Sequence, residues 1–193
     1  MRDFGLFLLR AVVGSLMAGH GAQKLFGWFG GFGLKGTSGW LESLGMRPGK
    51  PWAIMAGASE FGGGLLTLLG FLNPLGAIAS IGAMSMATVK AHWGKPIWNT
   101  SGGAELPIIN SAAFAAVALL RPGKYSLDNL LGLKITRWLL IPGLVGVAIV
   151  TAIGASAKPP VQPEQAEQAP TQEEGPTEQA REELQSGGQD QAA

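Results

Sequence analysis

Long apolar runs dominate this 193-residue chain and limit what it can fold into. A helix that crosses the hydrocarbon core of a bilayer, about 30 Å thick, needs about 20 mostly apolar residues. Runs of about this length cover residues 4–26, 52–71, 73–93, 104–121 and 135–156. We therefore expect an all-α membrane protein, a multi-pass protein of the cell membrane whose solvent is the lipid bilayer. The first run could instead be a signal peptide, but Arg10 interrupts it and no clear processing boundary precedes Phe26.

Charge divides the chain into a basic apolar body and an acidic tail. Residues 1–157 carry a net charge of +7, whereas residues 158–193 carry −6 together with five Pro and eight Gln. A segment so poor in large apolar side chains cannot offset the entropy cost of ordering, so we predict a disordered tail. The chain has no Cys, which excludes disulfides, thiolate metal sites and iron–sulfur ligation by the chain.

Small residues recur at helical spacing within the apolar runs. Lipid provides no hydrophobic drive between helices, so helices associate through close backbone approach at Gly and Ala. The spacing predicts a compact bundle rather than isolated anchors. The stripes with this spacing are Gly14, Ala18 and Ala22; Ala58 and Gly62; and Ala79, Ala83, Ala87 and Ala91.

The segment between the first two runs, residues 27–51, is rich in Gly and Trp. Thr37 or Ser38 is a suitable N-cap for a short helix that ends at Gly45. Trp40 and other tryptophans suit a membrane–water interface. We expect this segment to lie on the bilayer surface or to dip into it.

Topology brings the unusual polar residues to one face of the membrane, because successive helices alternate in direction. That face receives His20, Gln23, Lys24, Lys90, His92 and Glu105. Glu60 lies near the middle of the second run, where an ionised carboxylate costs on the order of 2.5–3.5 kcal/mol. It must be protonated, paired or directed into a wet cavity.

Some of these residues have simpler explanations. Lys90 and Lys95 stand near helix ends and could extend to the interface. His92 could be an interfacial histidine, or could continue an inward ridge formed by Ser85 and Thr88. Glu105 could be an acid favoured at a helix start.

The residue types in this cluster favour some chemistries over others. Two His and two carboxylates can bind a metal, but nearby Lys residues would repel a cation, so we predict no metal site. No further sign supports haem, and we expect no nucleic-acid partner. Acid, amine and imidazole groups suit proton transfer to a reduced quinone, and they suit anion binding equally well.

Several spaced motifs resemble the DoxX family over about residues 4–131. They are the segments His20–Gly27, Gly39–Gly45, Glu60–Gly64, Gly102–Glu105 and Pro122–Asp128, together with His92 followed by Gly94. The resemblance implies a four-helix transmembrane bundle in residues 1–131. Residues 132–157 would then be an extra C-terminal transmembrane helix, and residues 158–193 the disordered acidic tail.

The family resemblance also implies a function. DoxX-like proteins resemble the DoxD-type membrane subunit of a thiosulfate:quinone oxidoreductase, so we expect an integral membrane subunit that supports quinone-linked redox chemistry. We assign catalytic proton handling to Glu60 and His20, and substrate binding to Gln23, Lys24, His92 and Glu105. The chain has no nucleotide or flavin motif, so electrons would come from a redox protein partner. The alternatives are a non-catalytic scaffold for redox or oxidative-stress partners, and a small-solute or anion transporter.

Overall fold

The computed structural model describes residues 1–133 and 137–158, and the tail predicted to be disordered lies outside them apart from Lys158. Helices are the only regular elements in this part of the chain. The long ones are α1 (Arg2–Phe26), α3 (Gly49–Leu69), α4 (Leu75–Ala87), α5 (Glu105–Leu119) and α7 (Leu140–Ser156). Each falls within one of the predicted runs or overlaps most of it. By length and hydropathy α1 and α3 can span a membrane, while α5 and α7 are shorter apolar helices.

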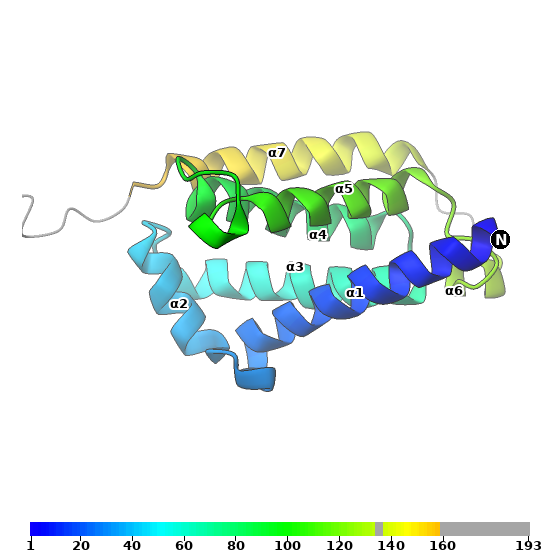
Figure 1. The fold of residues 1–193 in the computed structure, drawn as a ribbon, viewed down its shortest axis with the longest axis horizontal. Coiled ribbons are helices and arrows are strands. Elements are labelled where there is room, and N and C mark those ends of the chain that lie inside the picture. Colours follow the sequence, from blue (N-terminus) through cyan, green and yellow to red (C-terminus); the bar gives the residue numbers. More distant parts are fainter. Residues whose placement is uncertain (134–136, 159–193) are drawn as a thin grey trace, which may run out of the picture. The chain divides into compact units, whose positions relative to one another are not determined.

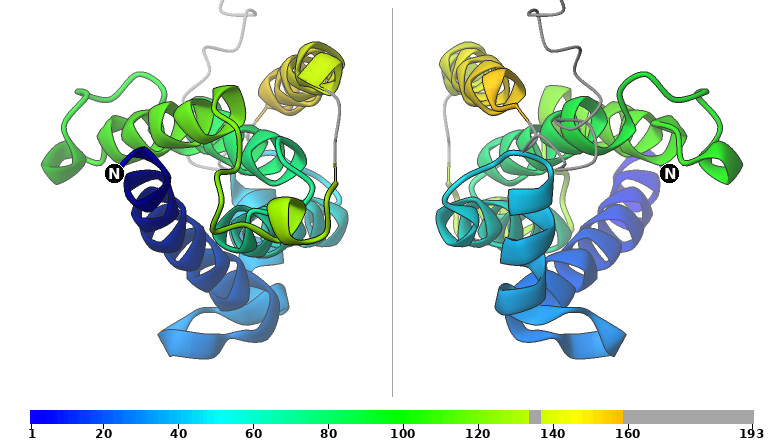
Figure 2. Two further views of the ribbon diagram at one scale, coloured as in Figure 1. Left: turned by 90° about the vertical axis from the view of Figure 1, so that its right-hand side faces the viewer. Right: turned by 90° about the vertical axis from the view of Figure 1, so that its left-hand side faces the viewer.

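The helices lie side by side with alternating directions (Figure 1). Helix α1 packs along α3, α3 packs against α4, and α4 contacts α5 and α7. The end-on views show α7 at the outer side of α4, away from α3 (Figure 2). Helix α1 is thus a packed part of the helical bundle in this structure.

Glycines allow α1 and α3 to approach at backbone distance. A Cβ atom added at Gly14 would lie 2.6 Å from the amide nitrogen of Leu68, and one at Gly64 would lie 2.7 Å from the carbonyl oxygen of Gly14. The predicted stripe on α3 is therefore wrong: Ala58 is exposed, and Gly62 faces open space. Helix α3 packs on α1, α2 and α4, and the residues that meet them are set by its rotation, which the sequence does not reveal.

The end of α4 departs from α-helical geometry. A π-helical turn, Thr88–His92, continues the helix, and the Thr88 hydroxyl donates to the carbonyl of Met84 at 2.9 Å. Such turns are wider than α-helical ones and are frequent at functional sites. The predicted ridge through Ser85, Thr88 and His92 assumed regular spacing, which ends at this turn.

A short helix, α2 (Gly33–Ser43), crosses the end of the bundle where α1 ends and α3 begins (Figure 1). It begins four residues before the predicted cap at Thr37, so Thr37 lies inside the helix, where its hydroxyl donates to the carbonyl of Lys24 at 3.4 Å. The Glu42 carboxylate accepts from the amide of Gly49, the first residue of α3, at 2.8 Å. Helix α2 is thus fastened to the end of α1 and to the start of α3.

The opposite end of the bundle carries a turn of helix, α6 (Leu127–Leu130) (Figure 1). The Asp128 carboxylate accepts from the backbone amides of Leu72 at 2.8 Å and Asn73 at 2.9 Å. Arg10, only 1% exposed, donates to the carbonyl of Tyr125. These contacts join the loops between successive long helices. Helix α4 begins at Leu75, directly after Pro74.

The outer surface of the long helices is apolar. A soluble protein covers such a surface with polar residues, whereas a lipid-facing surface has to be apolar. The exposed large apolar side chains include Leu8, Val12 and Leu16 of α1, Ile108 and Ile109 of α5, and Ile141, Val145, Ile149 and Ile153 of α7. This exterior is consistent with helices that lie in a bilayer.

Candidate functional site

A cavity of about 740 Å³ lies among the long helices on the side of the bundle covered by α2. We call it the inter-helix cavity. Apolar side chains form most of its wall, among them Met17, Trp52, Met84 and Val147. Its size and its largely apolar lining are typical of sites for small organic molecules. The polar side chains in the wall are His20, Lys24, Ser59, Glu60, Lys90, His92, Lys95, Asn110 and Thr151.

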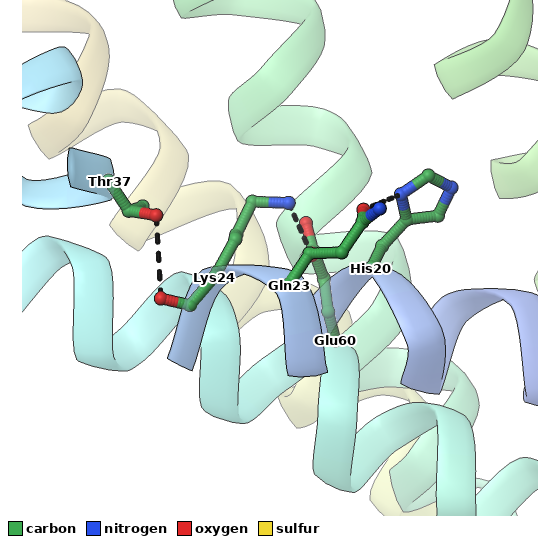
Figure 3. A network of polar contacts seen from close by, with 5 residues as sticks. All are labelled: His20, Gln23, Lys24, Thr37 and Glu60. Atoms are coloured by element: carbon green, nitrogen blue, oxygen red, sulfur yellow. Dashed lines mark hydrogen bonds and ion pairs between the residues drawn. The ribbon is translucent and has the colours of Figure 1, made fainter. Parts of the chain in front are cut away.

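An ion pair joins α1 to α3 in this wall. The ammonium of Lys24 lies 2.5 Å from the Glu60 carboxylate, and the two side chains are 25% and 5% exposed (Figure 3). The pair satisfies one of the three conditions set out for a carboxylate near mid-membrane. Because a buried charge is tolerated only when it is paired or hydrogen-bonded, Lys24 accounts for the presence of Glu60 at this depth.

His20 lies one helical turn before Lys24 on α1, and Gln23 holds it. The imidazole Nδ1 is 3.2 Å from the Gln23 side-chain oxygen, and the Gln23 amide nitrogen donates to the carbonyl of Phe29 at 3.4 Å (Figure 3). The second contact fixes the amide orientation, so the Gln23 oxygen faces the ring and Nδ1 carries the hydrogen. In the neutral ring Nε2 is then free to accept a proton.

The other histidine is held in a similar way at the end of α4. Nδ1 of His92 lies 2.7 Å from the carbonyl oxygen of Gly102, which can only accept, so Nδ1 donates there and Nε2 remains open. Lys90 donates to the carbonyl of Ala157 at 2.6 Å, and Lys95 donates to the carbonyl of Ala91 at 2.8 Å. Lys90 therefore links the π-helical turn to the end of α7, rather than simply extending to the interface.

Two of the predicted binding residues lie outside the wall of the inter-helix cavity. Glu105 accepts from the backbone amide of Asn99 at 2.9 Å and so braces the loop before α5. Gln23 lines a second cavity of about 550 Å³, beside α2. Lys24 and Trp40 line both cavities, so the ion pair stands between them.

Sequence reasoning missed part of the wall. Trp40 was assigned to the membrane interface, but it also lines the inter-helix cavity, as Trp52 does. Helix α7 contributes Gly146, Val147, Val150 and Thr151, although it was predicted to be an addition to the core. Only the tertiary packing of α7 on α4 brings these residues to the cavity, and no motif signals it.

The chemistry available at the site is proton exchange and hydrogen bonding. The described residues contain no cluster of three or more His, Asp or Glu side chains close enough to hold a metal ion. What the wall offers is a carboxylate–ammonium pair and two imidazoles, each with one ring nitrogen held by an acceptor. These groups can hold, donate or accept protons next to an apolar space.

Comparison with known proteins assigns the chain to a family. The DoxX family model matches residues 5–93. The inner membrane protein YqjF of Escherichia coli (strain K12) is 30% identical over 138 residues, which is 69% of this chain and 97% of that protein. The chain belongs to the DoxX family. It is thus a membrane protein, as the apolar exterior indicates. No solved structure matches it.

The DoxX match covers part of the cavity wall, including the ion pair. His20, Lys24, Glu60 and His92 lie within residues 5–93, whereas α5 and α7 lie beyond them. The polar wall residues Lys95, Asn110 and Thr151 also lie beyond the matched segment. Helix α7 lies outside the matched segment and contributes further residues to the cavity wall.

Proposed function

We propose that this DoxX protein is a multi-pass integral membrane subunit that supports quinone-linked redox chemistry. In this proposal α1, α3, α4 and α5 are the four spans of a core in residues 1–131, and α7 is an additional span. The apolar outer faces of the helices support this division. Helix α4 with its π-helical turn covers residues 75–92, a length of about 27 Å at 1.5 Å per residue.

The observation that carries the proposal is the partly buried Lys24–Glu60 pair in the wall of an apolar cavity. A quinone has a flat apolar ring, an apolar tail and two carbonyl oxygens that accept hydrogen bonds. Lys24 is the donor best placed to hold one of these oxygens, and Trp40 and Trp52 offer aromatic surface for the ring. Protein sites of this kind bind mainly through apolar contact and orient the ligand with a few polar groups.

Reduction of a quinone to a quinol consumes two electrons and two protons. The Lys24 ammonium of the ion pair can release one proton toward a reduced oxygen, and the Glu60 carboxylate can pass the next proton to the resulting Lys24 amine. His20, with Nε2 open, is the second candidate for proton transfer. The electrons come from a redox protein partner, because the sequence holds no nucleotide or flavin motif.

Two substitutions separate binding from proton transfer. Lys24→Met removes a charge-assisted donor and should weaken the binding of a short-chain ubiquinone about tenfold or more. Glu60→Gln keeps the volume and leaves Lys24 in place, so it should change affinity little but abolish quinone reduction in membranes that contain the partner. The matched controls are Lys35→Met on the exposed face of α2 and Asp3→Asn near the N-terminus.

The experiment combines two measurements on the full chain. Quinone that co-purifies with the protein is extracted and quantified, and affinity is measured by quenching of tryptophan fluorescence. Absence of quinone from the purified protein, with no binding at saturating ubiquinone, would contradict the proposal and favour a scaffold. Unchanged quinone reduction in Glu60→Gln would remove Glu60 from the proton path.

A further inference from the structure

The inter-helix cavity carries more positive charge than its single carboxylate can balance. Three lysines line it, and Glu60 is committed to Lys24. Lys90 and Lys95 donate only to the backbone carbonyls of Ala157 and Ala91, and neither forms an ion pair with any carboxylate in the described part of the chain. Lys90 is half-buried and Lys95 is exposed, and no carboxylate of the described residues neutralises either of these cations beside the apolar space.

These two cations lie together at the end of α4. Lys90 belongs to the π-helical turn, and Lys95 follows in the loop that leads to α5. The loop is a built structure: the amide of Glu105 donates to the carbonyl of Ile97 at 2.9 Å, and His92 is anchored on Gly102. The basic groups are consequently held at this end of the cavity rather than spread along a free loop. We call them, with His92, the basic mouth.

The space behind the basic mouth is apolar. Met84 and Met86 of α4, Leu106 of α5 and Val150 of α7 line it, and Trp52 stands on the α3 side. A small soluble anion would leave this apolar space unfilled, whereas a purely apolar molecule would leave the lysines unpaired. A ligand that satisfies both parts has an oxyanion head and an apolar chain.

We propose that the basic mouth binds the oxyanion head of an amphiphile whose apolar chain enters the inter-helix cavity. The head is either the phosphate of an anionic membrane lipid or the carboxylate of a free fatty acid, which present the same chemistry to Lys90 and Lys95. Charge-assisted hydrogen bonds from ammonium to oxyanion are among the stronger ones in proteins. This binding site does not depend on the proposed quinone chemistry.

Bromine atoms on the apolar chain provide the test, because they quench tryptophan on contact and Trp40 and Trp52 line the cavity. The full chain in neutral detergent is titrated with dibromostearate, with phosphatidylglycerol brominated on its chains, and with the uncharged methyl ester of dibromostearate. We expect at least one anionic probe to quench with saturation and the methyl ester to bind about tenfold more weakly. Saturable quenching by dibromostearate alone identifies a carboxylate ligand, and by the phospholipid alone a lipid headgroup.

Lysine variants test whether the preference for anionic probes comes from the basic mouth. The double variant Lys90→Gln with Lys95→Gln should bind the anionic probe about tenfold or more weakly, and its affinity for the methyl ester should be unchanged. Lys35→Gln with Lys50→Gln removes two exposed lysines outside the wall and should change neither. Loss of Lys90 also removes its hydrogen bond to the end of α7, so Lys95→Gln alone serves as a milder variant. We expect this single variant to bind the anionic probe several-fold more weakly.

Three results would overturn the proposal. One is saturable quenching of equal strength by the anionic probes and the methyl ester. Another is an equal loss of anion affinity in the Lys35/Lys50 control, which would point to general surface charge. The last is an unchanged anion affinity in both the Lys90/Lys95 variant and Lys95→Gln. None of these results bears on quinone binding, which the Lys24 and Glu60 variants test separately.

Discussion

Replacing the contact glycines of α1 and α3 by Ala tests the central packing of the fold. Gly14→Ala and Gly64→Ala each place a Cβ atom against the backbone of the facing helix, at 2.6 Å from the amide nitrogen of Leu68 and 2.4 Å from that of Ala18. Gly19→Ala on α1 and Gly62→Ala on α3 add the same methyl group where nothing lies within 4 Å. The two pairs therefore differ in packing but not in chemistry.

The magnitude follows from the distances. Ordinary contact begins near 3.4 Å, so accommodation of the new methyl group requires the helices to separate by about 0.8–1.0 Å. A gap of this size forfeits a quarter to a half of the dispersion energy along the interface, and overpacking costs about 1–3 kcal/mol. All four variants gain about 0.5–1 kcal/mol, because Ala favours a helix over Gly, and this gain cancels in the comparison. The test and control variants should therefore differ by about 1–3 kcal/mol in the free energy of unfolding.

The assay is reversible unfolding of each variant in the same detergent, followed by circular dichroism. We expect Gly14→Ala and Gly64→Ala to be destabilised, and Gly19→Ala and Gly62→Ala to be as stable as the wild type or more so. Equal stability of all four variants would refute the close approach of α1 and α3. It would also remove the basis for placing Lys24 opposite Glu60.

Further predictions concern the ends of the bundle, α7 and orientation. Arg10→Met removes the donor to the carbonyl of Tyr125 and should lower the free energy of unfolding by about 1–3 kcal/mol. Arg2→Met at the exposed N-terminus should leave it unchanged, and equal effects of the two substitutions would show that Arg10 has no structural role. Truncation after Gly132 should leave an inserted, folded core that binds ubiquinone more weakly, since α7 forms one wall of the cavity; complete degradation in cells would show that α7 belongs to the core. With a cytoplasmic N-terminus, a membrane-impermeant thiol reagent applied to intact cells should label Ser43→Cys but not Lys124→Cys; the opposite pattern would reverse the orientation.

Much of the helical framework could be predicted from the sequence, because the apolar runs are long and turn signals separate them. The start of α2 could not, since the Thr37 hydroxyl bonds to Lys24 across the structure instead of capping its own helix. The stripe on α3 was misplaced for a similar reason. Spacing gives the period of a helix, but its rotation depends on which neighbours it meets.

The candidate site was predictable in part. The cost of burying a carboxylate near mid-membrane predicted a partner for Glu60, and Lys24 is that partner. The sequence did not indicate which residue it would be, because the two lie 36 positions apart. The roles of Glu105 and Lys90 depend on partners at Asn99 and Ala157, which only the folded loops bring close. Such backbone contacts leave no residue pattern that sequence reasoning can detect.

The most direct test of the central claim asks whether a quinone occupies the inter-helix cavity. The chain contains no Cys, so a single introduced thiol gives an unambiguous signal. Ser59→Cys places a thiol in the cavity wall next to Glu60, and Ser43→Cys places one at the exposed end of α2. We predict that a short-chain ubiquinone slows the reaction of Ser59→Cys with N-ethylmaleimide in proportion to occupancy and leaves Ser43→Cys unaffected. Equal labelling of Ser59→Cys with and without saturating ubiquinone would contradict the account.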